Sequence, residues 1–249
     1  MSECDWDEIF GPDYLHFYGW YLQDERAEQE TELLERLLEL EPGLAVLDVP
    51  CGQGRIANRL ARAGCDVVGL DLYERFLDVA RAGAQELGVH VEYVRGDMRE
   101  LPWDGRFDRI VNWSTSFGFF DDAGNRATLE RFRGALRPGG RLLLEPINPE
   151  RFLRALPRGQ DELVAVAEVG ADRMIDRFRY DPVSGRVETK RTVVRDGAVR
   201  GSAFSMRAFT IPELRDWLLA AGFARVDAYD EEGRPFGPGA AKAVVVASC

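Results

Sequence analysis

The stretch LDVPCGQGRIA, residues 47–57, decides how this 249-residue chain folds. It joins a short apolar run, residues 44–49, to a segment with apolar residues at helical spacing, residues 54–64. Glycines at such a junction permit unusual backbone angles and a close approach by a ligand, and free N–H groups at a helix start bind anions. Because tight strand–helix turns also use glycine, the loop is a candidate site that needs support from the rest of the chain.

The pattern around this loop repeats along the chain. From residue 44 to residue 147, apolar runs alternate with segments of helical periodicity. Such alternation predicts βαβ units with right-handed crossovers, and therefore a parallel sheet with helices on both faces. Strands are expected at 44–49, 66–72, 89–97, 107–113 and 141–147, and helices at 24–40, 54–64, 73–88 and 125–137.

After Pro149 the pattern changes. Residues 172–209 contain two turn signals, DPVSG and RDG, between runs rich in Val, Thr, Phe and Tyr, which predicts two or three antiparallel strands. A helix is expected over 210–222, because Thr210 can cap its start and Gly222 its end. Two further strands close the chain, in FARVDAYD and AKAVVVAS.

Composition limits the functions open to the chain. The net charge of −11 disfavours a nucleic-acid partner, since binding phosphates needs a basic surface. No apolar run approaches the roughly 20 residues that span a bilayer, and the first ten residues are acidic where a signal peptide is basic. The four cysteines show no CxxC spacing, and no metal-ligand constellation is visible. We expect a reduced, cytoplasmic protein without a membrane or metal partner, either a monomer or a homodimer.

Carboxylates end the next two strands and support a nucleoside site. Asp71, about 20 residues after the loop, is placed to accept both ribose hydroxyls, although it could instead cap the following helix. Asp97 could accept a hydrogen bond from an adenine amino group while the Met98 backbone N–H donates to the ring, unless Asp97 is an ordinary turn residue. All of these features fall at the carboxyl ends of consecutive strands, where open α/β sheets bind ligands.

A nicotinamide-dependent oxidoreductase is the first alternative, because its fold also begins with a glycine loop. Its fingerprint G-x-G-x-x-G is incomplete here, since the third glycine is replaced by Ala57. Asp48 also precedes the loop and would repel a pyrophosphate. An acid at this place suits a ligand with an ammonium group, such as the methionyl end of S-adenosylmethionine.

Five motifs in order, VLDVPCGQGR, GLDL, RGDM, FDRIVNWSTSFGFF and LRPGGRLLLE, resemble those of the class I S-adenosylmethionine-dependent methyltransferases. The family pattern is an acid followed by three alternating glycines. This chain matches it at Asp48, Gly52 and Gly54 but carries Pro50 at the first glycine, which removes one N–H from the loop. The outer motifs, among them RFRYDPVSGRVE and MRAFTIPELRDWLLAAGF, are similar to those of small-molecule methyltransferases such as amino-sugar N-methyltransferases.

Together with the strand pattern, the resemblance implies an α/β fold. Its core is a Rossmann-like, mostly parallel seven-stranded sheet with helices on both faces, and an antiparallel β insert follows the fifth strand. The chain is expected to divide into an N-terminal helical lid at 1–43, an S-adenosylmethionine-binding core at 44–149 and 209–249, and a β-rich substrate-binding insert at 150–208.

The resemblance also implies a role for each motif. The loop would hold the methionyl end of the cofactor, Asp71 the ribose, and Asp97 with Met98 the adenine. Trp113 and Phe117 would stabilise the sulfonium by about 0.5–2 kcal/mol, unless they are plain core residues. The expected cofactor-binding residues are Tyr14, Asp48, Cys51, Gly52, Gly54, Arg55, Asp71, Leu72, Asp97, Met98, Asn112, Trp113 and Phe117.

A general base is harder to find. His90 starts a strand at the end away from the ligand edge, which leaves His16, in the aromatic lid segment PDYLHFYGWY, and its neighbour Tyr18 as the catalytic candidates. The scarcity of bases favours methyl transfer to a small-molecule amine, because an amine needs only to lose its proton to solvent or to a carboxylate. Transfer to oxygen, and a catalytically silent module that binds S-adenosylmethionine, remain alternatives.

The insert is rich in basic residues, and alternate residues of a strand point to opposite faces. These side chains either form a solvated face or include a subset that binds a carboxylate or phosphate of the acceptor. Arg177 and Arg179 are predicted to affect binding of the acceptor but not of the cofactor. The basic residues are Arg173, Arg177, Arg179, Arg186, Lys190, Arg191, Arg195, Arg200 and Arg207.

Overall fold

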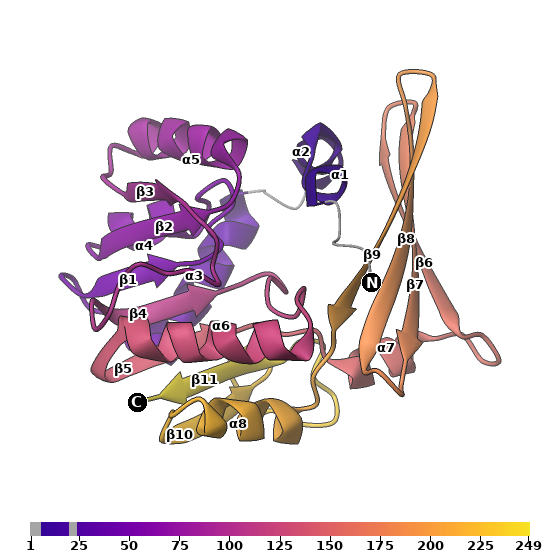
Figure 1. The fold of residues 1–249 in the computed structure, drawn as a ribbon. Coiled ribbons are helices and arrows are strands. Elements are labelled where there is room, and N and C mark those ends of the chain that lie inside the picture. Colours follow the sequence, from indigo (N-terminus) through magenta and orange to yellow (C-terminus); the bar gives the residue numbers. More distant parts are fainter. Residues whose placement is uncertain (1–5, 20–23) are drawn as a thin grey trace.

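Within residues 6–19 and 24–249, which the computed structural model describes, two β-sheets organise the chain (Figure 1). In the larger sheet only the last strand of the chain runs antiparallel to both of its neighbours, so the predicted mostly parallel seven-stranded sheet is confirmed. Its strand order is β10 (Arg225–Tyr229), β11 (Val244–Ser248), β5 (Leu136–Leu144), β4 (Phe107–Asn112), β1 (Ala45–Asp48), β2 (Asp66–Asp71) and β3 (Glu92–Arg95).

Helices cover both faces of this sheet, as the alternating pattern predicts. On one face lie α3 (Asp24–Leu38) and α4 (Ala57–Arg62), with α5 (Glu74–Leu87) packed beside α4. On the other face lie α6 (Asp122–Ala135) and α8 (Ile211–Ala220). No helix of the described residues is both long enough and apolar enough to cross a bilayer.

The predicted N-terminal lid separates into two parts in the structure. The leucine stripe of α3 is buried against the large sheet, where Leu34 and Leu38 join a cluster with Val46 of β1. Burial of that stripe makes α3 part of the core. Only α1 (Trp6–Ile9) and α2 (Pro12–Tyr18) lie between the two sheets in Figure 1.

The second sheet is an antiparallel meander that follows α7 (Pro149–Ala155). Sequence patterns predicted two or three strands here, and the structure has four. The missed strand, β6, has a continuous Val- and Ala-rich sequence instead of an alternating one, and it lies at the sheet edge with Val164 and Val166 about half exposed. The four strands are β6 (Glu162–Val169), β7 (Asp172–Asp181), β8 (Arg186–Arg195) and β9 (Ala198–Arg207).

Candidate active site

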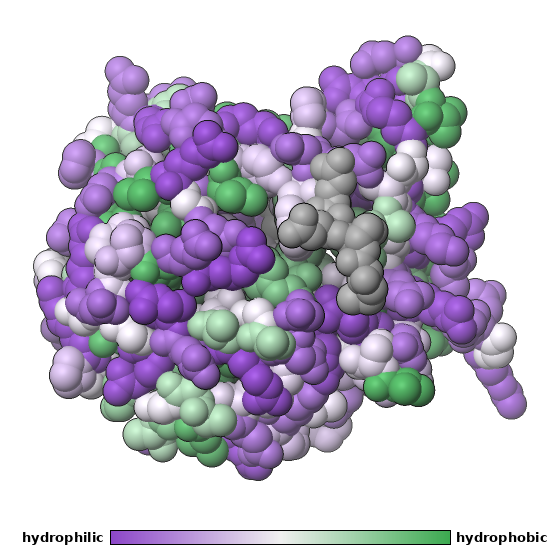
Figure 2. All heavy atoms as spheres, in the orientation of Figure 1, coloured by the Kyte–Doolittle hydropathy of each residue, from purple (hydrophilic) through white to green (hydrophobic). Residues whose placement is uncertain are grey.

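A cavity of about 600 Å³ lies between the carboxyl ends of the parallel strands and the second sheet. The loops after β1, β2, β3 and β4 line one side of it, the inner face of β7, β8 and β9 lines the other, and α1 and α2 contribute the residues between them. In the orientation of Figure 2 the surface is largely hydrophilic, and hydrophobic residues show in the hollow between the two halves. The sheet edge predicted to bind a ligand therefore lines one cavity together with the second sheet.

The glycine loop after β1 has the backbone that the sequence predicts. Gly52 and Gly54 both have positive φ, +52° and +73°, in the left-handed region that glycine tolerates. A Cβ added to Gly52 would meet nothing within 4 Å, so this residue opens toward the cavity. A Cβ on Gly54 would come within 2.2 Å of the Tyr93 hydroxyl. Gly54 is thus required by packing behind the loop, and it does not line the cavity.

Asp71 links the glycine loop to the helix that follows β2. Its Oδ2 accepts the Gly52 N–H at 2.9 Å and its Oδ1 accepts the Tyr73 N–H at 2.9 Å. Burial raises the pKa of this carboxyl, while these backbone donors favour its charged form. Asp71 lines the cavity together with Leu72. Tyr73 is the N-cap of α5 and no side chain caps that helix, so Asp71 forms a turn with Tyr73 and does not cap the helix.

Asp48 is a buried carboxyl at the floor of the site. Its Oδ2 accepts a hydrogen bond from the Ala57 N–H at 3.1 Å. Burial raises the pKa of this carboxyl to about 7, although the positive charge of Arg55 acts to lower it. Cys51 lies beside it, and burial raises the pKa of this thiol well above its usual range. Both residues line the cavity. An ammonium group entering here would meet a buried carboxyl that gains from a positive partner.

Asp97 and Met98 line the cavity at the end of β3. Both carboxylate oxygens of Asp97 face the Arg99 guanidinium, with Nη2 at 2.6 Å from Oδ2 and Nε at 3.1 Å from Oδ1. Burial opposes ionisation of Asp97, but the hydrogen bonds from Arg99 prevail and lower its pKa. The carboxylate is therefore charged and fixed in orientation at the cavity wall.

The segment after β4 is strained and held by buried charges. Ser114 has φ +60°, its N–H donates to Glu145 Oε2 at 3.0 Å, and its Oγ accepts from Arg55 Nη2 at 2.8 Å. Arg55 also pairs with Glu30, and Lys242 Nζ lies 3.0 Å from Glu145. A strained backbone of this kind persists only where several surrounding contacts hold it in place, and such strain clusters at functional sites. Sequence patterns did not single out this network, because its members lie far apart in the chain.

Two residues predicted from the same segment lie away from the cavity. Asn112 is fully buried and donates to the Val49 carbonyl at 2.7 Å, which joins β4 to β1. Phe117 is fully buried and stacks on Phe209 at 5.4 Å between ring centroids. Trp113, by contrast, lines the cavity. The core-packing alternative therefore describes Phe117, because its ring completes the apolar cluster under α8.

His16 does not line the cavity either. Its Nε2 lies 2.9 Å from Asp172 Oδ2 at the start of β7, so the ring points toward the second sheet. Tyr14 and Tyr18 of the same helix do line the cavity, and burial raises the pKa of the Tyr18 hydroxyl. A helix exposes different residues on different faces, and the sequence alone did not show which face is turned inward.

Arg177 and Arg179 point away from the site, which contradicts the prediction that they bind the acceptor. They alternate along β7 with Asp176 and Phe178, which line the cavity. Arg177 and Arg179 are instead 53% and 64% exposed on the outer face of the sheet, where Arg177 pairs with Glu162 at 2.9 Å. Strand periodicity separates these two sets, but only the structure shows which set faces inward.

Aromatic residues that the sequence analysis did not single out form much of the remaining wall. Trp6 meets Phe119 edge-on at 5.1 Å between ring centroids, and Phe10 contacts both Tyr14 and Phe119. The aromatic composition of the lid segment was the available signal. These lining residues are Trp6, Phe10, Phe119, Phe120, Phe178 and Phe204.

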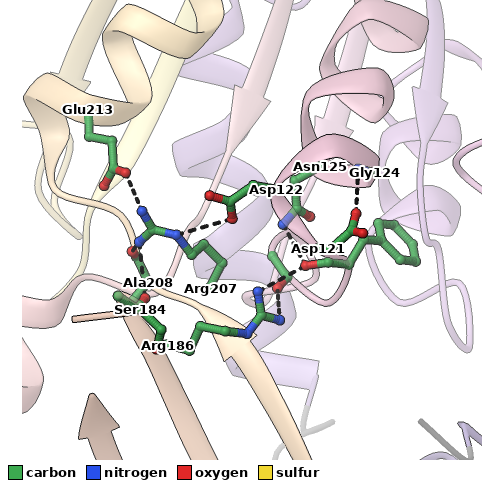
Figure 3. Close-up of polar contacts among 12 residues, drawn as sticks. Asp121, Asp122, Gly124, Asn125, Ser184, Arg186, Arg207, Ala208 and Glu213 are labelled. Carbon is green, nitrogen blue, oxygen red and sulfur yellow. Dashed lines mark hydrogen bonds and ion pairs between the residues drawn. The ribbon is translucent and has the colours of Figure 1, made fainter. Parts of the chain in front are cut away.

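Two arginines of the second sheet fix the loop that carries Phe119 and Phe120 (Figure 3). Arg186 Nη1 donates to the Phe120 carbonyl at 3.0 Å, and the Arg207 N–H donates to the Gly118 carbonyl at 2.7 Å. The Arg207 guanidinium lies 3.4 Å from Asp122 at the start of α6 and also pairs with Glu213 of α8. The second sheet thus fixes the aromatic wall of the cavity by hydrogen bonds to the backbone of the loop that carries Phe119 and Phe120.

We predict that Arg186→Met lowers the free energy of unfolding by about 1–2 kcal/mol, because it removes the guanidinium hydrogen bonds to the Phe119 and Phe120 carbonyls and to the Ser205 hydroxyl. Urea denaturation followed by circular dichroism measures the change. Lys190→Met is the matched control, since Lys190 is an exposed residue of the same strand and should stay within about 0.5 kcal/mol of the wild type. Equal losses in the two variants would contradict the role of Arg186.

Comparisons with known proteins point to one family of enzymes. Residues 46–140 match a family model described as a methyltransferase domain. The chain is 31% identical to a cypemycin N-terminal methyltransferase of Streptomyces sp over 183 residues, 72% of either chain. It is 31% identical to a ubiquinone biosynthesis O-methyltransferase of Azorhizobium caulinodans over 166 residues, 58% of this chain and 62% of that protein. The chain thus spans less than two thirds of the length of this second relative.

The fold agrees with a solved structure of the same kind. An amino pentose methyltransferase from Micromonospora echinaspora, involved in calicheamicin biosynthesis and solved with S-adenosylmethionine bound, superposes with a TM-score of 0.67. The two chains are 21% identical, and the match covers 96% of this chain and 97% of the other. The ordered motifs, the sheet order and these relatives lead to one conclusion: the chain belongs to the S-adenosylmethionine-dependent methyltransferases.

Proposed function

We propose that the protein transfers the methyl group of S-adenosylmethionine to an amine nitrogen of a small molecule bound between the core and the second sheet. The observation that carries this proposal is the single cavity that joins the glycine loop to the inner face of β7, β8 and β9. The cypemycin relative, named as an N-terminal methyltransferase, supports nitrogen as the acceptor atom.

The charged groups of the cavity also favour nitrogen over oxygen. The polar groups that line the cavity on the side of the second sheet are Asp176, Arg191 and the Tyr18 hydroxyl. Burial raises the pKa of the Tyr18 hydroxyl. No histidine, the commonest general base for a hydroxyl acceptor, is among the described lining residues, whereas a carboxylate can hold an amine by its N–H groups. Aromatic walls attract positive charge and exclude water, which suits both a sulfonium donor and an alkylammonium product.

Each part of the cavity has a place in the proposed reaction. When bound, S-adenosylmethionine would supply a methyl group activated by its sulfonium: the amine lone pair would form a bond to the methyl carbon, and the sulfur would keep the electron pair of the broken C–S bond and leave as S-adenosylhomocysteine. Asp48 would receive the methionyl ammonium, Asp71 the ribose hydroxyls, and Asp97 with Met98 the adenine. The chain's main contribution is then to hold the amine in line with the methyl group, where proximity alone lowers a barrier by several kcal/mol.

A matched pair of acceptors tests the choice of nitrogen. With methyl-labelled S-adenosylmethionine, 2-phenylethylamine should be methylated faster than 2-phenylethanol, as measured by S-adenosylhomocysteine release and by mass spectrometry of the product. His16→Ala should keep the rate within a few-fold, because His16 lies outside the cavity. If the labelled methyl group were found on the oxygen of 2-phenylethanol, and the methylation rate fell by about 10² or more in His16→Ala, a general base would serve a hydroxyl acceptor.

Calorimetry separates this function from the remaining alternatives. We expect S-adenosylmethionine and S-adenosylhomocysteine to bind, and NAD not to bind. Tight binding of NAD alone would indicate an oxidoreductase. Binding of both S-adenosyl ligands without transfer to any acceptor in a broad screen would favour a catalytically silent module.

A further inference from the structure

The inner face of the second sheet brings a band of polar side chains into an otherwise apolar wall. Asp176 of β7 and Arg191 of β8 are partners in strand register, and Thr189 lies two residues before Arg191. All three are buried within the protein and line the cavity. Their neighbours on this face are Phe178, Val187, Phe204 and Met206.

Arg191 is already matched by other groups. Its Nε and Nη2 lie 2.8 Å from Oδ1 and Oδ2 of Asp176, in a two-pronged ion pair. Nη2 also donates to the Tyr18 hydroxyl at 3.0 Å, and Nη1 to the Ile9 carbonyl at 3.4 Å. An anionic ligand at this place would have to displace a buried carboxylate, which is costly. Asp176 keeps capacity for a further donor, because a carboxylate offers about four acceptor sites, and here Arg191 and the Tyr18 hydroxyl are its partners.

The other guanidiniums that line the described cavity are matched in the same way. Arg55 pairs with Glu30, and Arg99 with both oxygens of Asp97. No cationic group of the described wall is therefore left without a carboxylate partner. Aspartates also outnumber arginines among the described lining residues, with Asp48, Asp71, Asp97 and Asp176 against Arg55, Arg99 and Arg191.

We infer that the acceptor is an amine with an apolar body that carries no carboxylate, sulfate or phosphate, and that its amine group docks against Asp176. This inference rests on the proposed function, since it takes nitrogen as the acceptor atom. The carboxylate provides acceptors for the N–H groups, and the aromatic face around it holds the apolar body. Arg191 is a positioning residue that holds both oxygens of Asp176 in a fixed orientation.

Two probes of matched shape and opposite charge test the inference. Binding of 2-phenylethylamine and of phenylacetate is measured by calorimetry, with the protein saturated with S-adenosylhomocysteine. The wild type should bind the amine more tightly by about tenfold. Asp176→Asn removes the negative charge beside Arg191 and should reverse the preference, so that phenylacetate binds better. Arg177→Gln, next in sequence but on the outer face, should keep the wild-type preference.

The outcomes separate this inference from the proposed function, because binding does not require turnover. Equal or tighter binding of phenylacetate by the wild type would overturn the inference, as would binding of neither probe. Retention of the amine preference in Asp176→Asn would assign recognition to another group. If that variant fails to fold, the wild-type comparison of the two probes still decides. Methylation at oxygen would overturn only the proposed function.

Discussion

Replacing Asp71 with alanine is expected to weaken S-adenosylhomocysteine binding by about 1–3 kcal/mol, or about 5–150-fold in Kd. In the structure this carboxylate holds the N–H groups of Gly52 and Tyr73, so its loss frees the glycine loop from the start of α5. In the proposed complex it also receives the ribose hydroxyls. Both effects lower affinity, because the loop loses its support and the ligand loses a charged acceptor.

Titration calorimetry on Asp71→Ala and on Asp66→Ala measures this effect. Asp66 begins the same strand at its far end and is exposed, so its removal should leave affinity unchanged. Thermal unfolding of both variants shows whether the chain stays folded. If Asp71→Ala lost stability but bound S-adenosylhomocysteine as the wild type does, the carboxylate would serve only to support the glycine loop and the ribose contact would be wrong.

The fold could be predicted largely from the sequence, because the spacing of the apolar residues differs between strands and helices. Residues 44–147 alternate between strand-like and helix-like spacing, and the structure places a parallel strand in each apolar run. Strand β6 was missed for a physical reason: its Val- and Ala-rich sequence has no alternation, because consecutive residues of this edge strand are exposed and neither of its faces is fully buried. Helix α3 was assigned to the lid, although its leucine stripe predicts burial against a sheet.

The site could be predicted only where it follows the chain order. Asp48, Asp71 and Asp97 end consecutive parallel strands, and a parallel sheet brings such ends together whatever the rest of the chain does. The ion pair of Asp176 and Arg191 depends on strand register, and His16 depends on the rotation of a short helix. Neither the register of two strands nor the rotation of a short helix can be read from a local stretch of sequence. The side of the cavity next to the second sheet could therefore be described only from the structure.

Asp48 gives the second large effect, on stability. Its pKa is raised by burial to about 7, against a usual value of 3.8, so between these values the folded chain binds a proton that the unfolded chain has released. Stability rises with pH only where the unfolded state binds more protons. The contribution of Asp48 is therefore present below about pH 4 and lost progressively up to about pH 7, at about 1.4 kcal/mol per pH unit.

Asp48→Asn is expected to remove this dependence, because the amide is neutral at every pH and can still accept the Ala57 N–H. At pH 8 the variant should be more stable than the wild type, by an amount on the order of 4 kcal/mol. The same substitution should weaken S-adenosylhomocysteine binding, since the methionyl ammonium loses its charged partner. A gain in stability at the expense of binding is typical of a buried functional charge.

Urea denaturation of both proteins from pH 5 to pH 8 isolates the contribution of this one carboxyl, because all other groups titrate equally in the two. The difference in unfolding free energy should grow through this range and level off above pH 7. Wild-type affinity for S-adenosylhomocysteine should rise over the same range, since the ammonium selects the ionised carboxyl. If the unfolding free energies of the two proteins changed in parallel from pH 5 to pH 8, Asp48 would be charged over that whole range. Unchanged affinity for S-adenosylhomocysteine in Asp48→Asn would place the methionyl ammonium elsewhere in the cavity.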